Sequence, residues 1–273
     1  MASLVERLVP GELWVLFRRV VPLTEVVRPQ GGGRRRADDR EVLAAIIFVA
    51  TSGCTWRQLP PVFGPCWPTV YRRFAQWSQA RVWARLHRVI LDELGARGEL
   101  DWSRCAIDSV SVRAAKGGKL TGPNPTDRGK MGSKIHLITD RNGLPLSLGI
   151  SAANLHDSQA LMPLVGGIPP IRSPRGPRRR RPGKLHADKG YDYDHLRRWL
   201  RSRGIAHRIA RKGIESSQRL GRHRWVVERT VSWLAGCRRL HRRYERKPEH
   251  FLAFTGIAAA LICHRRLTQR SNT

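Results

Sequence analysis

The spacing of apolar residues changes near residue 103, and this change constrains the fold more than any other feature of the sequence. Before it, apolar residues recur at helical spacing, as in the run from Val42 to Val49. From Ser103 onward, short runs alternate apolar and polar side chains, which is typical of β-strands. We therefore expect a helical part over residues 1–98, an α/β part over residues 99–265 and a flexible tail over residues 266–273.

The α/β part is expected to begin with three strands. Asp108 lies in the first, Lys134–Thr139 forms the second and Leu144–Ser151 the third. Asn142-Gly143 between the last two runs is a strong hairpin signal. The remaining order is helix, strand, helix, strand and helix, which predicts a mixed five-stranded sheet flanked by helices. A basic insertion, residues 172–183, has the composition of a segment that is disordered when free.

The helical part carries recognisable start and stop signals. Asp38 or Asp39 can cap a helix that Gly53 ends, and Thr55 can open a short helix. A longer helix is then expected from Thr69 to about residue 94. A short helix, a tight turn and a longer basic helix are typical of a helix-turn-helix DNA-binding unit. A plain helical bundle with a basic surface would give the same pattern.

The charge of the chain limits its partners. Lys and Arg number 51 against 21 Asp and Glu, a formal net charge of +30. Such a surplus repels itself unless a polyanion neutralises it. Arginines run from Arg18 to Arg270, so a basic tail alone does not explain the charge. Nucleic acid is the expected partner, because each phosphate contact releases a condensed counterion.

The cysteines and apolar runs indicate the cellular setting. The five cysteines lie far apart and form no C-x-x-C pair, which argues against a zinc site or a disulfide framework. Glu6 and Arg7 interrupt any apolar run at the N-terminus, so no signal peptide is expected. The runs Val42–Ala50 and Phe251–Cys263 are too short to span a membrane. These features predict a cytoplasmic protein.

Three acids stand out in a chain that is poor in acids. Asp108 lies inside a strand pattern, Asp188 follows a strand end and Glu228 lies on a helix crowded with arginines. Each alone has an ordinary explanation: an ion pair with Arg113, a helix cap, or an ion pair with Arg224. Together, two aspartates on strands and a glutamate on a later helix can converge on hard cations, which prefer carboxylate oxygens. Two such cations can hold the attacking and leaving oxygens of a phosphoryl transfer.

The residues around these acids resemble a known family. The strand A-I-D-S, the segment H-A-D-K-G-Y-D and the helix R-W-V-V-E-R-T-V-S-W-L are similar to those of insertion-sequence transposases of the DDE class, in the insertion-sequence four/five-like superfamily. The N-terminal runs T-W-R-Q-L-P and W-P-T-V-Y-R-R-F-A-Q-W resemble the helical domain that precedes this core. The resemblance covers roughly Arg40 to Leu261, and the third motif is the most specific.

The resemblance implies an RNase H-like catalytic core in which Asp108, Asp188 and Glu228 bind two Mg²⁺ or Mn²⁺ ions. It implies a polynucleotidyl transferase that nicks DNA at the ends of an insertion sequence and joins the freed 3′-hydroxyl to target DNA. The expected partners are terminal inverted repeats, target DNA and further copies of the chain in a dimer or higher multimer. The expected location is the bacterial cytoplasm, at the nucleoid. An inactive DNA-binding repressor and an RNase H-like nuclease without strand transfer are the alternatives.

Basic and polar side chains near these motifs are expected to contact DNA. Arg224, four residues before Glu228, matches a basic residue of related transposases, whereas Gly221 and Ala235 stand where the wider group has Tyr and Lys. The expected DNA contacts are Arg57, Tyr71, Arg72, Arg73, Gln76, Lys116, Lys119, Lys134, Arg178, Arg179, Arg180, Arg224, Arg229, Arg238 and Arg239.

Three further features were open to more than one interpretation. Asp157 follows the third strand, where it could be an additional acid of the site, although helix capping is the favoured role. The Gly- and Lys-rich segment Lys116–Lys134 could be a DNA-contacting loop or a long linker. His186 precedes Asp188 by two residues but is not counted among the metal ligands.

Overall fold

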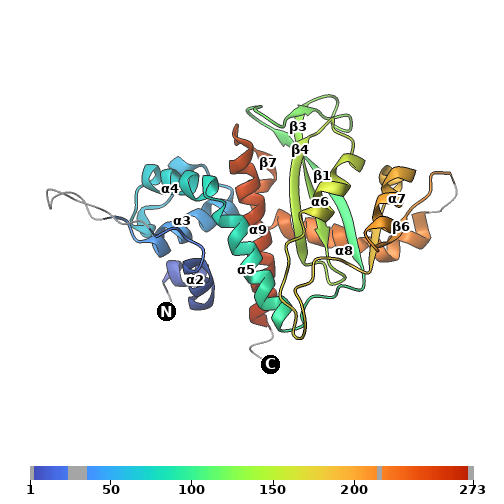
Figure 1. Cartoon of the computed structure of the whole chain (residues 1–273). Coiled ribbons are helices and arrows are strands. Elements are labelled where there is room, and N and C mark those ends of the chain that lie inside the picture. The colour runs from blue at the N-terminus through green and yellow to red at the C-terminus, as the bar shows by residue number, and fades with distance from the viewer. Residues whose placement is uncertain (1–2, 24–35, 214–216, 270–273) are drawn as a thin grey trace.

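The computed structural model describes residues 3–23, 36–213 and 217–269, with side chains of 217–224 outside the description. The run of glycines and arginines at residues 31–35 therefore lies outside the described residues. A helical part stands at one end of the molecule and a twisted sheet at the other, with the long helix α9 (Pro248–Gln269) between them (Figure 1).

The helical part follows the expected start and stop signals closely. Asp38 accepts hydrogen bonds from the backbone N–H groups of Arg40 and Glu41, and Gly53 ends the same helix with φ +75°. Thr55 opens a single 3₁₀ turn, as predicted. The elements are α1 (Leu4–Leu8), α2 (Gly11–Arg18), α3 (Asp39–Ser52), η1 (Trp56–Gln58), η2 (Pro61–Phe63), α4 (Trp67–Gln79) and α5 (Val82–Ala96).

The prediction of one long helix beginning at Thr69 was wrong. The chain forms two helices, because Arg81 adopts the left-handed conformation with φ +54° and turns the chain between α4 and α5. The first helix also begins earlier, at Trp67, with Pro68 in its first turn. Proline is tolerated there because the first N–H groups of a helix have no partner within the helix. No glycine or proline marks the break at Arg81.

The sheet has the strand order β4-β3-β1-β5-β6. The strand β3 is antiparallel to both β1 and β4, whereas β5 and β6 run parallel to β1. This mixed order is that of the RNase H-like fold, as expected. Two-residue strands, β2 beside β3 and β7 beside β1, extend the predicted set of five. The strands are β1 (Cys105–Ala114), β2 (Gly122–Pro123), β3 (Met131–Thr139), β4 (Pro145–Ala152), β5 (Lys184–Ala187), β6 (Ala206–Ile209) and β7 (Arg242–Arg243).

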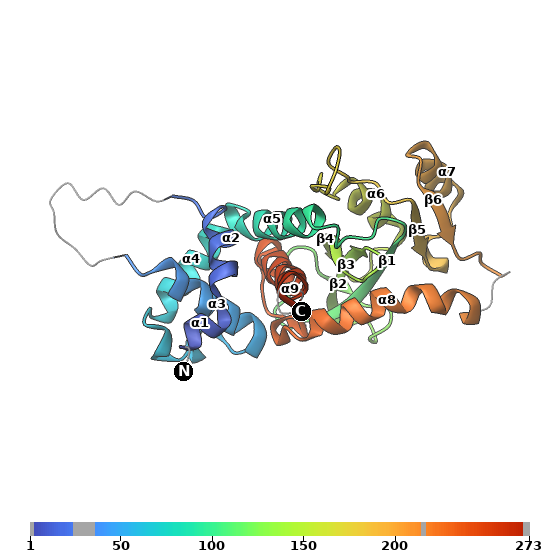
Figure 2. The ribbon, with the colours of Figure 1, turned by 90° about the horizontal axis from the view of Figure 1, so that it is seen from below.

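Helices cover both faces of the sheet. Figure 2 shows α6 (Ser158–Gly166) and α7 (Asp194–Ser202) on one side, with α8 (Ser217–Ala235) on the other. The helix α8 packs against β1, β3 and β5. It ends at Ala235, before Gly236 and the 3₁₀ turn η4 (Arg238–Leu240). A further 3₁₀ turn, η3 (Lys189–Tyr191), follows β5.

The helix α9 joins the two parts of the molecule. It packs against α3, α4 and α5 on one side and against β4 and α8 on the other, and its apolar residues belong to a continuous hydrophobic core. It continues to Gln269, so residues 266–269 of the expected flexible tail are helical. By length and composition α9 could cross a membrane, but 72% of its apolar window is buried inside the protein. A helix buried to this extent is typical of the core of a folded protein.

Candidate active site

The strand β1 lacks a neighbouring strand along part of one edge, within the described residues. Its pairing with β5 ends at Ala106, and its pairing with β7 begins at Arg113. Asp108 lies in this gap and is partly exposed. The backbone N–H of Ser109 donates to Asp108 Oδ1 at 2.8 Å, which orients the carboxylate.

Asp188 lies beside this gap, one residue past the end of β5. The pair Ala106–His186 is the last of the parallel register, and Asp108 and Asp188 each follow that pair by two residues. Asp188 keeps an extended backbone, with φ −81° and ψ −174°, and its Oδ1 accepts the backbone N–H of Gly190 at 2.9 Å. Because paired strands lie about 5 Å apart, both partly exposed aspartates stand just beyond the point where β1 and β5 meet.

Both aspartates are on the side of the sheet that α8 covers. Ser109 points the other way, since its Oγ donates to Asp157 Oδ1 at 2.8 Å and Asp157 precedes α6. Successive side chains of a strand point to opposite faces, so Asp108 points toward the α8 side. Asp188, which follows the last β1–β5 pair by the same number of residues, points the same way.

Glu228 is an exposed residue of α8. The neighbouring residues show how the helix is turned: Arg229 donates to Asn142 O at 2.7 Å and Thr230 Oγ1 to Gly143 O at 2.6 Å, at the β3–β4 turn. That turn lies at the end of the sheet where β1 begins. Val227 and Thr230 are buried and mark the inner side of α8, so at about 100° per residue Glu228 lies near the outer, solvent-exposed side of the helix.

The described residues contain no ready cluster of three His, Cys, Asp or Glu side chains close enough to hold a metal ion. Asp108 and Asp188 belong to neighbouring strand segments at the open edge of β1, and Glu228 belongs to α8, which packs against β1 and β5. What this arrangement offers chemically is a pair of oriented carboxylates at an open sheet edge, with a third carboxylate on the covering helix. Carboxylate oxygens of this kind suit Mg²⁺ or Mn²⁺.

Asp157 does not cap α6, so the favoured interpretation of this residue was wrong. Its side chain makes no capping hydrogen bond. Instead it accepts from Ser109 and pairs with Lys134 Nζ at 3.0 Å. Lys134 Nζ also donates to Leu155 O at 2.8 Å. Lys134, expected to contact DNA, is thus held on the α6 face of the sheet, away from the aspartates.

The helical part exposes most of the side chains expected to contact DNA. Arg57, Tyr71, Arg72 and Gln76 are all exposed, the first on η1 and the others on α4. Arg73 differs, because it is largely buried between Asp39, its ion-pair partner, and the ring of Trp77. Burial is the larger influence on Arg73 and lowers its pKa.

The basic insertion, residues 172–183, is folded back onto the protein rather than extended away from it. Ile171 and Arg179 form an isolated β-bridge, Arg178 pairs with Asp92 at 2.7 Å, and Arg180 donates to Gly166 O at 2.8 Å. The expectation of a disordered segment overlooked these distant acceptors. All three arginines still keep exposed surface.

The expected DNA contacts near the acids have different environments. Lys116, Lys119 and Arg238 are exposed. Arg239 is only 6% exposed, pairs with Glu245 at 2.8 Å and donates to Cys54 O at 2.9 Å, so it ties the α8–α9 connection to the helical part. The side chain of Arg224 lies outside the described residues.

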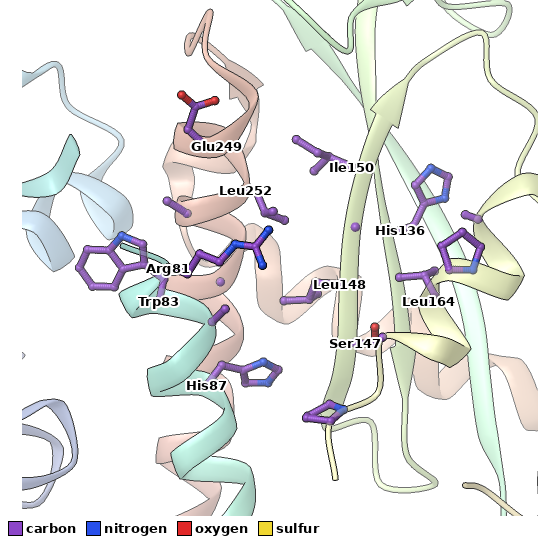
Figure 3. A pocket seen from close by; sticks show the side chains of 18 of the residues that line it. Arg81, Trp83, His87, His136, Ser147, Leu148, Ile150, Leu164, Glu249 and Leu252 are labelled. Carbon is purple, nitrogen blue, oxygen red and sulfur yellow. The ribbon is translucent and has the colours of Figure 1, made fainter. Parts of the chain in front are cut away.

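A large cleft of the described residues lies away from the acids. It has a volume of about 900 Å³ and lies between the helical part and the free edge of β4. Figure 3 shows His87 of α5 and Leu252 of α9 facing Leu148 and Ile150 of β4, with Arg81, the residue before α5, on the same side as His87. His87 Nε2 lies 2.9 Å from Pro145 O at its lower end, and burial lowers the pKa of His87 to about 4. Neither Asp108, Asp188 nor Glu228 lines this cleft.

Two family descriptions match the chain. Residues 103–263 match "Transposase DDE domain" and residues 9–87 match "Putative transposase of IS4/5 family".

A protein of Burkholderia cepacia, "Putative transposase for insertion sequence element IS402", is 49% identical over 143 residues, which are 52% of this chain and 68% of that protein. An uncharacterized 16.2 kDa protein of the IS402 insertion element of B. cepacia is 37% identical over 123 residues, covering 43% and 81%. A solved complex of the Mos1 transposase with its left transposon end is 11% identical, covers 93% of this chain and 86% of its own, and has a TM-score of 0.26, too low to support an argument.

Proposed function

Because the chain belongs to the IS4/5-like family of insertion-sequence transposases, whose DDE domain it carries, we propose that Asp108, Asp188 and Glu228 are its catalytic acids. The reaction would be metal-dependent cleavage of DNA at the ends of the element, followed by transfer of the 3′ end into target DNA. The observation that supports this proposal is the open edge of β1, where Asp108 and Asp188 each follow the last β1–β5 pair by two residues.

The residues present fit a pair of divalent cations. Two carboxylates with fixed orientation provide the oxygen donors that Mg²⁺ and Mn²⁺ prefer, and Glu228 on α8 can complete the set. Divalent ions bound there would supply the chemistry of lowering the pKa of an attacking water and stabilising the leaving 3′ oxygen. Carboxylates repel one another, so the final approach of Glu228 is expected to depend on bound cations.

The protein's own groups position the reactants. The backbone N–H groups of Ser109 and Gly190 hold one oxygen of each aspartate, so the carboxylates need little reorganisation when DNA arrives. The missing strand neighbour of β1 leaves room for a phosphodiester to approach them. Phosphoryl transfer asks mainly for such positioning and charge stabilisation.

The helical part is proposed to bind the terminal repeats. Tyr71, Arg72 and Gln76 lie on the exposed side of α4, and Arg57 lies over the ring of Trp67 at its start. The net charge of +30 adds affinity for any DNA, including target DNA. Assembly into a dimer or higher multimer on DNA and action in the bacterial cytoplasm complete the proposal.

The experiment is a cleavage and strand-transfer assay with the full chain, its own element's end DNA and Mg²⁺ or Mn²⁺. The variants Asp108→Asn, Asp188→Asn and Glu228→Gln should each lose nicking and joining while binding the same DNA. Asp194→Asn, which changes an exposed acid on α7, is the matched control and should cleave like the parent.

The assay separates the alternatives. Nicking without joining by the parent would indicate a nuclease. Tight DNA binding with no cleavage in either metal would indicate a repressor or an inactive remnant. Full activity in any one of the three acid variants would remove that acid from the site.

A further inference from the structure

A second pocket lies at the C-terminal end of α9, where this helix meets α8 and the β3–β4 turn. It has a volume of about 460 Å³. Three arginines line it: Arg229 from α8, and Arg265 and Arg266 from α9. Trp233 forms an aromatic wall, and Asn142 and Gln269 add amide groups. Nothing in the sequence patterns marked Arg265 or Arg266, because the two lie far from the recognised motifs.

The pocket carries uncompensated positive charge. Arg266 pairs with Glu99 at 3.3 Å, but no carboxylate of the described residues pairs with Arg229 or Arg265. The buried Nε atoms of Arg229 and Arg266 also have no hydrogen-bond acceptor among the described residues. A cluster of three guanidinium groups with one counter-charge favours an anionic ligand, and guanidinium groups suit phosphate oxygens in particular.

Aromatic rings hold the central arginine in place. The guanidinium carbon of Arg229 lies 4.9 Å from the ring centroid of Trp225 and 4.7 Å from that of Trp233. Both rings reach solvent, with 53% and 36% of their surface exposed. Arg229 is therefore fixed in orientation before any ligand arrives, and apolar surface stands beside the charge. This combination suits a phosphate that belongs to a nucleic-acid strand rather than an isolated ion.

The position of the pocket relates it to the proposed active site. Glu228 and Arg229 are consecutive on α8, and Arg229 lines the pocket. A helix with its side chains is about 10 Å across, a distance that a DNA backbone spans within a few nucleotides. A DNA strand lying over the exposed side of α8 could thus touch both.

We propose that this pocket binds a phosphodiester group of DNA, at a position a few nucleotides from the bond that is cut. The inference rests on the proposed function only in taking DNA as the substrate. It assigns Arg265 and Arg266 as contacts outside the acids, the helical part and the basic insertion. Arg229 positions the phosphate from the α8 side.

The test uses the full chain, a duplex carrying its element's end and the variants Arg265→Gln and Arg265→Lys. Arg265 is exposed and forms no ion pair among the described residues, so its replacement should leave the fold intact. Arg265→Gln should weaken DNA binding by about tenfold at low salt. It should also reduce the slope of log K against log salt by about 0.9, the value for one lost phosphate contact. Arg18→Gln, an exposed arginine at the end of α2, is the matched control and should change neither quantity as much.

Phosphate ethylation interference locates the contact without relying on activity. In the parent, ethylation of one or two phosphates near the cleaved bond should block binding. In Arg265→Gln the same modifications should no longer matter, while Arg265→Lys should keep the interference in weaker form. An interference pattern and a salt slope identical in the parent and Arg265→Gln would overturn the proposal. So would a substitution that changes only the binding of inorganic phosphate and leaves the binding of DNA unchanged. Failure of the proposed function would look different, because the interference would change as predicted while the parent failed to cut.

Discussion

Arg243 is the largest fully buried side chain of the described residues, with 1% of its surface exposed. Its guanidinium donates to the carbonyl oxygens of Leu120, Lys119 and Glu245 and to Ser133 Oγ. These contacts fasten the loop between β1 and β3 to the connection that leads into α9. The segment Lys116–Lys134 is thus anchored on its inner side, while Lys116 and Lys119 remain exposed.

Replacing Arg243 with Lys should lower the free energy of unfolding by about 3 kcal/mol or more. An ammonium group cannot reach all the acceptors of the planar fork, and each buried carbonyl left without a donor costs about 1–3 kcal/mol. Urea unfolding followed by circular dichroism measures the loss. Arg242→Lys, at the exposed neighbouring position, should cost less than about 0.5 kcal/mol. Equal effects at the two positions would show that the buried hydrogen bonds matter little.

Asp140 makes stability depend on pH. Burial raises its pKa to about 6, although the backbone N–H groups of Asp101, Asn142 and Leu144 donate to its carboxylate and act in the opposite direction. A carboxyl whose pKa is higher in the folded state than in the unfolded state binds its proton more tightly when folded. Its protonation therefore stabilises the fold fully below pH 3.8, and this contribution is lost as the pH rises through about 6.

The comparison of Asp140→Asn with the parent isolates this effect, because the other acids are common to both proteins. As the pH falls from 7 to 4, the parent should gain up to about 3 kcal/mol of unfolding free energy relative to the variant. Urea unfolding at several pH values provides the measurement. A difference between the two proteins that stays constant with pH would mean that the pKa of Asp140 is not raised.

At the scale of elements, the break between α4 and α5 stores backbone strain. Arg81 occupies the left-handed region at φ +54°, which costs a residue with a Cβ atom about 1–2 kcal/mol. Arg81→Gly should therefore raise the free energy of unfolding by about 0.5–1 kcal/mol, after allowing for the greater freedom of glycine in the unfolded chain. The same substitution at Arg88, an exposed position within α5, should lower it by about 1 kcal/mol. Thermal unfolding of the two variants should thus shift in opposite directions, and a loss of stability in both would refute the strain at Arg81.

Elements with local signals could be predicted from the sequence. Asp38 and Gly53 set the ends of α3 through contacts within a few residues, and Asn142-Gly143 set the β3–β4 turn. The break at Arg81 has no such local signal, and the helix after it, α5, packs against α9, which is distant in the sequence. The helix α9 was missed as an element, since it is buried on two sides and lacks an amphipathic stripe.

The candidate site was predictable in composition but not in geometry. The three acids stood out because carboxylates are scarce in this chain. Their mutual placement depends on the parallel register of β1 and β5, which joins residues about 80 apart in the sequence. Nor could composition show which arginines face inward: Arg239 and Arg243 are buried and hold the fold together, whereas Arg265 opens onto the second pocket.

For the whole molecule, the net charge of +30 predicts opposite effects of salt on the free and the DNA-bound protein. Without DNA, the charges repel one another across the folded surface, and added NaCl screens this repulsion. The Tm of the free protein should therefore rise as NaCl increases.

With duplex DNA present, binding stabilises the folded state, but salt weakens that binding by reversing the release of counterions. The Tm of the complex should then start higher and fall with NaCl until the two curves meet. Differential scanning fluorimetry over a series of NaCl concentrations provides the measurement, with the duplex alone as the blank. A Tm that rises with salt to the same extent in both samples would show that DNA does not neutralise the folded surface.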